Sequence, residues 1–188
     1  MPLILHVPKR ELFDDVRSVV YDVPAKTLTL EHSLLSISKW ESKWNKPYLP
    51  QPLLPKSSQI KTRAETLDYV RCMTIENNVD PNVYLALSNA ELNKIMAYIN
   101  APMTAQKLSK SKQGRGNDII TNELIYYWMT ALSIPFRPCE TWHLNHLLAL
   151  IELCARKNEP SKKMKPNEIL KQNQSLNKAR RAKHHTRG

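Results

Sequence analysis

The first thirty-two residues carry short apolar runs of the kind that form β-strands. The runs are LILHV at 3–7, SVVYDV at 18–23 and TLTLEH at 27–32. In the third run Leu28 and Leu30 alternate with polar residues, which leaves one apolar and one polar face. Pro-Ala-Lys separates the second run from the third. We therefore predict a small N-terminal β-hairpin between these two runs, in a β region over 1–32 that packs on the rest of the chain.

From Ser33 onward the apolar residues recur at helical spacing. Ser33 can cap a helix, because a serine hydroxyl accepts a backbone N–H of the first turn. The apolar face that follows consists of Leu34, Ile37, Trp40 and Trp44. Two tryptophans four residues apart are typical of a buried face, and we expect them to fasten the hairpin to the helical body. If they were exposed, they would form a protein-binding hot spot instead.

A proline-rich linker over 46–58 follows this helix and is expected to cross the surface in an extended conformation. Beyond it, two helices open with the capping boxes Thr62–Glu65 and Ser88–Glu91. In a capping box the hydroxyl and the carboxylate each bind a backbone N–H that the helix leaves unpaired. Asp80-Pro81 can start a short helix between them, because proline suits the first turn of a helix.

Two strongly apolar helices are predicted nearer the C-terminus, where they form the centre of the core. The first covers 118–133, and Pro135 and Pro138 interrupt the chain after it. Thr141 can cap the second, whose apolar stripe is Leu144, Leu147, Leu148, Ile151 and Cys154. The whole pattern predicts a mainly α domain over 33–157 with a small N-terminal β-hairpin, which is the α+β class.

The last segment, 158–188, has too few apolar residues to build a core of its own. If it is helical, Ile169, Asn173, Leu176 and Arg180 fall on one face. Only a thin apolar line is therefore available on that face. Such a helix is marginal alone in water. We therefore predict a basic C-terminal helical extension that becomes ordered on a partner surface.

Most of the positive charge of the chain lies in that extension. The net charge is +11, and eleven Lys and Arg against two acidic residues from Arg156 to Gly188 supply +9 of it. The rest of the chain is therefore nearly neutral, which argues against a nucleic-acid-binding domain as a whole. A second basic segment is the loop over 107–117, which holds two of the three glycines.

These two basic segments supply the candidate contact residues. In the extension the candidate partner-binding residues are Ile169, Leu176, Lys178, Arg180, Arg181, Lys183 and Arg187. In the loop the candidate contacts for phosphate or for an acidic surface are Lys107, Lys110, Lys112 and Arg115. Neither segment contains Phe, Tyr or Trp, which a stacking platform for single-stranded nucleic acid needs. We therefore favour docking on an acidic protein, or a solvated loop and terminus without a partner, over specific nucleic-acid recognition. Non-specific contact with phosphates stays open as an alternative.

The sequence offers little support for a metal site. Two Cys and two His lie close enough in the chain to suggest zinc, namely Cys139, His143, His146 and Cys154. Their spacing does not present paired ligands on turns, as structural zinc sites do. We predict buried cysteines with surface or capping histidines, and no metal or other cofactor.

Motifs that are absent, the cysteine spacing and the length of the apolar runs limit the function classes that fit the sequence. None of the common phosphate-binding, hydrolase or metalloprotease motifs occurs, so we predict a protein that is not an enzyme. Three cysteines without CxxC spacing indicate a reducing compartment. No run approaches the roughly 20 apolar residues that span a bilayer, and no membrane association is expected.

Four segments resemble a family of small proteins from tailed-bacteriophage genomes. They are TLTLEHSLLSISKWESKWNKPYL, TLDYVRCMTI, YYWMTALSIPFRPCETWHLNHLLALI and LNKARRAKHHTRG. On these residues the chain is similar to the tail assembly chaperone type of morphogenesis protein. The resemblance implies a protein that is not an enzyme and that binds the tape measure protein and the tail tube subunits during assembly. It also implies a location in the cytoplasm of the infected host cell.

Two other functions remain open at this level. One is a permanent virion protein of the tail or the head–tail junction, whose basic tail contacts acidic protein or DNA. The other is a small metal-dependent or nucleic-acid-processing enzyme. The oligomeric state does not follow from the sequence.

Overall fold

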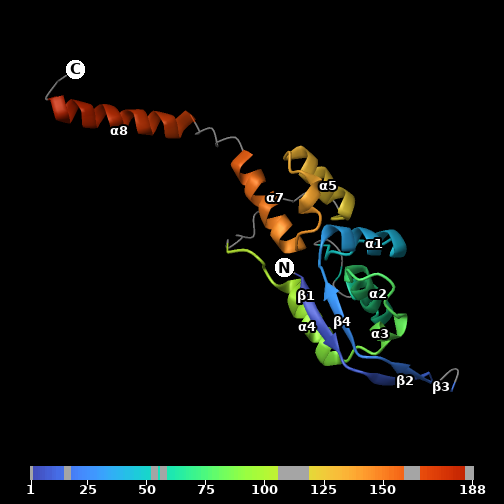
Figure 1. Ribbon diagram of the computed structural model, residues 1–188. Coiled ribbons are helices and arrows are strands. Elements are labelled where there is room, and N and C mark those ends of the chain that lie inside the picture. The colour runs from blue at the N-terminus through green and yellow to red at the C-terminus, as the bar shows by residue number, and fades with distance from the viewer. Residues whose placement is uncertain are drawn as a thin grey trace. The chain divides into compact units, whose positions relative to one another are not determined.

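The computed structural model describes residues 2–14, 18–51, 55, 59–105, 119–158 and 166–184. The chain divides into two compact units, Met1–Ala155 and Arg156–Gly188. Figure 1 shows the order of strands and helices along the chain. Strands near the N-terminus are followed by several helices, and this confirms the predicted α+β class.

The N-terminal strands form one long antiparallel ribbon that is interrupted in the middle. The strands are β1 (Leu3–Val7), β2 (Arg10–Asp14), β3 (Val19–Val23) and β4 (Lys26–Leu30). β1 pairs with β4, from Leu3 opposite Leu30 to Val7 opposite Lys26. β2 pairs with β3 in the same continuing register, from Arg10 opposite Val23. The ladder stops where Pro8 and Pro24 lie, and proline has no N–H to donate.

The predicted pairing of the second and third apolar runs is therefore wrong. These runs become β3 and β4, which follow one another along the same side of the ribbon. The partner of β3 is the polar strand RELFD, which the apolar pattern did not reveal. Charged residues are tolerated in this strand because a two-stranded ribbon exposes most of its surface to water.

Four helices begin at the caps that the sequence predicts. They are α1 (Leu34–Trp44), α2 (Arg63–Met73), α3 (Pro81–Leu85) and α4 (Asn89–Asn100). The Ser33 hydroxyl accepts the Ser36 N–H ahead of α1. Both capping boxes are present, at Thr62 with Glu65 and at Ser88 with Glu91. Local hydrogen bonding therefore sets the start of these helices, as in isolated capping motifs.

The later helices are α5 (Asn122–Ala131), α6 (Phe136–Cys139), α7 (Leu144–Asn158) and α8 (Pro166–His184). The predicted cap at Thr141 is wrong, because its hydroxyl donates to the Pro138 carbonyl at 2.7 Å and α7 begins three residues later. His143 precedes α7, and its Nδ1 accepts the Asn145 N–H at 3.3 Å. The short helix α6 lies where Pro135 and Pro138 were predicted to interrupt the chain.

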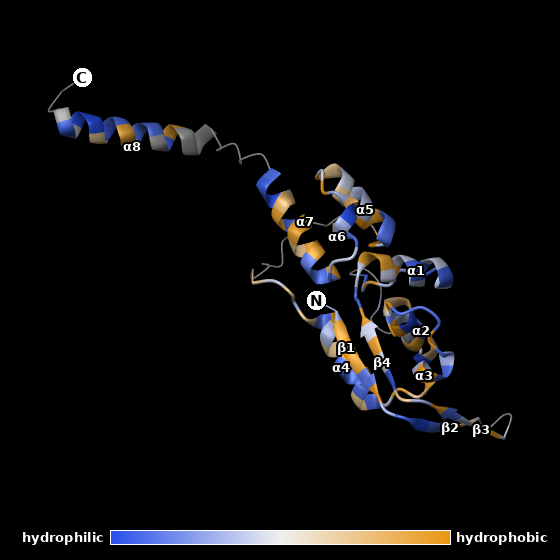
Figure 2. Ribbon diagram, in the orientation of Figure 1, coloured by the Kyte–Doolittle hydropathy of each residue, from blue (hydrophilic) through white to orange (hydrophobic). Residues whose placement is uncertain are grey.

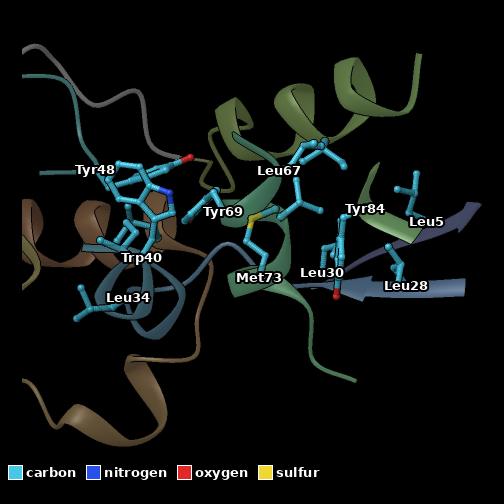
Figure 3. Packing of buried hydrophobic residues seen from close by; sticks show 14 of the residues in the cluster. Leu5, Leu28, Leu30, Leu34, Trp40, Tyr48, Leu67, Tyr69, Met73 and Tyr84 are labelled. Atoms are coloured by element: carbon cyan, nitrogen blue, oxygen red, sulfur yellow. The ribbon is translucent and has the colours of Figure 1, made fainter. Parts of the chain in front are cut away.

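The core of the first unit joins the ribbon to the helices. Figure 3 shows Leu30 of β4 near Met73 of α2, and Trp40 of α1 near Tyr48. α1 packs against α2 and α5, and α4 packs against β1. Figure 2 shows apolar positions gathered along β1 and β4. The β region is thus held by apolar contacts on one face of the ribbon.

The proline-rich linker departs from its predicted course across the surface at two residues. Tyr48 and Gln51 are both buried. The Gln51 side chain makes two hydrogen bonds with the backbone of Ile120, donating to its carbonyl at 2.9 Å and accepting its N–H at 2.7 Å. These contacts tie the linker to the segment that leads into α5.

Candidate protein-binding surface

The candidate partner-binding residues lie on α8, whose described side chains are exposed. Leu170 is 60% exposed and Leu176 is 49% exposed, which is high for leucine. Lys178, Arg180, Arg181 and Lys183 are also exposed. Figure 2 shows a largely hydrophilic helix with a few apolar positions. Exposed leucines among several cations are typical of a helix that binds an apolar surface with acidic surroundings.

Several of the predicted contact residues lie outside the described residues. These are Arg187 of the C-terminus and the four loop cations, Lys107, Lys110, Lys112 and Arg115. Ile169 belongs to α8, but its side chain also lies outside the described part. The structure therefore brings Leu176 and four of the candidate cations onto one helix.

The tryptophan pair of α1 makes hydrogen bonds with α2. Trp40 is buried, and its Nε1–H donates to the Glu65 carbonyl at 2.9 Å. The Nε1–H of Trp44, which is half-buried, donates to the Asp68 carboxylate at 2.9 Å. Because both indoles find their partners in α2, they stabilise the helical body. A hot spot at Trp40 is excluded by its burial.

The four Cys and His residues weighed as zinc ligands have other environments. Cys139 is buried and Cys154 is half-buried. The ring of His146 stacks on Trp142 with centroids 4.8 Å apart. Across the residues that the structure describes, no group of three or more His, Cys, Asp or Glu is placed to hold a metal ion.

A buried cluster of histidines and tyrosines was missed by the sequence analysis. His32, at the end of β4, contacts the Tyr69 hydroxyl through Nδ1. Its ring centroid lies 5.0 Å from that of His143. Burial, followed by the neighbouring His143, lowers the pKa of His32 to about 3. These histidines act as polar groups of the core, and each makes at least one ring hydrogen bond there. Two single histidines 111 positions apart form no sequence pattern, so nothing in the sequence predicts that they meet.

His143 has a defined tautomer within this cluster. Its Nε2–H donates to the Tyr98 carbonyl at 3.1 Å, while Nδ1 accepts from the Asn145 N–H. Burial lowers the pKa of His143, and the bond to Tyr98 offsets this only in part. The ring therefore caps α7 in its neutral form and joins that helix to α4.

The half of the ribbon formed by β2 and β3 exposes a second apolar surface. Phe13 and Val20 lie directly opposite one another across the two strands. They are 62% and 55% exposed, and Val19, whose side chain lies on the opposite face of the ribbon, is 42% exposed. At the base of this half, the Arg10 guanidinium donates to the Glu91 carboxylate of α4 at 2.7 and 3.0 Å. This pair anchors the ribbon to the helices.

A scan of protein-family models and searches of curated proteins and of solved structures found no match to the chain. No helix among the described residues has the length and apolar character that crossing a membrane requires.

Proposed function

We propose that the chain is a bacteriophage tail morphogenesis protein that is not an enzyme and that binds tape measure or tail tube protein through α8. The observation that carries this proposal is the exposure of Leu170 and Leu176 beside the cations of the same helix. The phage assignment rests on the resemblance of the segments quoted above. In this proposal α8 is the partner-binding helix of a basic C-terminal extension.

The chemistry of α8 defines the surface it would bind. Its leucines need an apolar strip, since a helix of this composition gains stability only by burying them. Its cations need acidic residues around that strip, because like charges there would repel the helix. The partner is therefore an acidic protein with an apolar groove, and tape measure and tail tube proteins are the first candidates.

The test is a pull-down of purified tape measure and tail tube proteins with the full chain. We compare the natural chain with Leu170→Ser/Leu176→Ser and with Lys178→Gln/Arg180→Gln/Arg181→Gln. Each variant is expected to weaken binding by about tenfold or more, which corresponds to about 1.4 kcal/mol. The charge variant should also reduce the dependence of binding on salt concentration.

A matched control is Phe13→Ser/Val20→Ser, which removes exposed apolar side chains from the ribbon and leaves α8 intact. Equal binding by the α8 variants and the natural chain would contradict the role of α8. Absence of binding to either phage protein would contradict the proposed function. Mass spectrometry of purified particles separates an assembly protein, which is absent from them, from a permanent virion component.

A further inference from the structure

Lys61 lies at the centre of a site that the proposed role of α8 does not use. Its Nζ donates to the Tyr48 carbonyl at 2.8 Å. The same nitrogen lies 4.2 Å from the centroid of the Tyr48 ring and 5.7 Å from that of Trp40. An ammonium group held over two aromatic faces is stabilised by the negative potential of the rings.

Two cavities meet at this lysine. The first, of about 270 Å³, extends between α2 and α4 along an apolar wall that includes Val70, Leu92, Ile95 and Met96. The second, of about 360 Å³, extends along the linker past Pro47 and Leu49. Tyr48, Gln59 and Lys61 line both cavities. The two cavities therefore adjoin at these three residues, with the Lys61 cation between them, and we call the adjoining pair the groove.

The polar groups around Lys61 are already engaged by the protein. The Glu65 carboxylate accepts from Lys46 and from the Thr62 N–H. The Glu41 carboxylate accepts the N–H groups of Tyr48 and Asn122. Lys61 carries three N–H bonds, and the Tyr48 carbonyl accepts one of them. The groove thus offers hydrogen-bond donors on a cation between two apolar walls.

This chemistry fits a carboxylate with apolar groups on both sides. A carboxylate would accept from Lys61, and a charge-assisted hydrogen bond in a half-buried site is stronger than a neutral one. Burial lowers the pKa of Lys61, although Glu65 and Glu41 act in the opposite direction. A bound carboxylate would favour the charged ammonium group and so offset part of the cost of its burial.

We infer that the groove binds an extended segment of a partner protein in which an acidic residue lies between apolar residues. Each cavity holds one or two side chains, and their junction at Lys61 calls for a ligand that continues in both directions. Met96 and Ile60, which are 44% and 76% exposed, lie at the two walls and add apolar contact area. Methionine is common at surfaces that adapt to peptides. The inference deepens the proposed protein-binding function and rests on it, but it uses a different surface from α8.

The experiment titrates the full chain with two labelled peptides, acetyl-Leu-Leu-Asp-Leu-Leu-amide and the same peptide with Asn in place of Asp. We expect the Asp peptide to bind about tenfold more tightly, with chemical-shift changes at Tyr48, Val70 and Met96. Lys61→Met keeps the apolar stem and should abolish the difference between the peptides. Lys94→Met, at an exposed position of α4, is the matched control and should preserve it.

A second variant tests the groove in case Lys61→Met does not fold. Met96→Glu adds a negative charge at the exposed wall, and it should weaken binding of the Asp peptide more than that of the Asn peptide. Equal binding of the two peptides, or no binding at millimolar concentration, overturns the inference. Binding of sodium octanoate without binding of the peptide overturns the assignment to a protein partner. Peptide binding with a failed pull-down of the phage proteins leaves the groove standing and contradicts the proposed function.

Discussion

The Glu41 carboxylate in α1 accepts the backbone N–H of Asn122, the first residue of α5, at 2.8 Å although 81 positions separate them. Its other oxygen accepts the Tyr48 N–H at 2.6 Å. One buried carboxylate thus supplies a hydrogen-bond partner to the start of α5 and holds the linker in the core. Burial raises the pKa of Glu41, and the two backbone hydrogen bonds offset this in part.

Replacing Glu41 by Gln should lower the free energy of unfolding by about 1–3 kcal/mol. A glutamine side chain presents one oxygen, so one of the two buried N–H groups loses its acceptor. Denaturant titration followed by circular dichroism measures the change. Glu11→Gln on the exposed face of β2 is the control. Equal stability of the two variants would mean that water replaces the carboxylate without cost.

The two tryptophans should differ in their effect on stability. Trp40→Ala empties a fully buried site and should cost about 3–5 kcal/mol. Trp44→Ala should cost less, because Trp44 is half-buried. Thermal and denaturant unfolding of both variants provides the comparison. A larger loss for Trp44→Ala, or an unchanged melting temperature for Trp40→Ala, would contradict the packing described for α1 on α2.

Arg10 should anchor the base of the ribbon to the helical body. Burial opposes ionisation of Glu91, but hydrogen bonds from Arg10 and Ser88 outweigh it and lower the pKa of Glu91. Arg10→Met removes the cation from that carboxylate, which keeps its bonds from Ser88, and removes the guanidinium donor from the Ala86 carbonyl. We expect a loss of about 1–3 kcal/mol and faster amide exchange in β2 and β3.

The control for this variant is Lys9→Met. Lys9 pairs with Asp22 on the exposed part of the ribbon. Ion pairs of this kind contribute little in water, so no measurable loss of stability is expected. Unchanged amide exchange in Arg10→Met would show that apolar contacts alone hold the ribbon.

The histidine cluster should make the protein sensitive to acid. The folded pKa of His32 is about 3, below the ordinary value of 6.5, so the unfolded chain takes up a proton first. The stabilisation from neutral His32 is present above pH 6.5 and is lost as the pH falls toward 3. The expected slope is about 1.4 kcal/mol per pH unit in this range. Burial lowers the pKa of His143 as well, which adds to the loss.

Unfolding free energies between pH 7.5 and 4 test this expectation. His32→Gln should be less stable at neutral pH but should show a smaller slope. His6→Gln, at an exposed position of β1, should keep the natural slope. If the slope is the same in all three chains, other groups cause the acid sensitivity.

Much of the helical part of the fold follows from short stretches of sequence. Ser33, Asp80 and the two capping boxes act over three or four residues, and their hydrogen bonds form as soon as the first turn forms. The periodic apolar residues then decide which face of each helix is buried. These features explain why the start of α1, of α2 and of α4 could be predicted.

The tertiary structure decided the relationships between distant segments. The polar strand β2 pairs with β3 because the chain folds back on itself after residue 14, which no periodicity encodes. Trp40 finds its acceptor in α2, and His32 meets His143, only when the helices pack. Hydrogen bonds and ring contacts across such separations depend on the position of whole elements. The sequence by itself therefore determined where α1, α2, α3 and α4 begin, because their caps act locally. The packing of the helices determined which polar groups meet and where the groove around Lys61 lies.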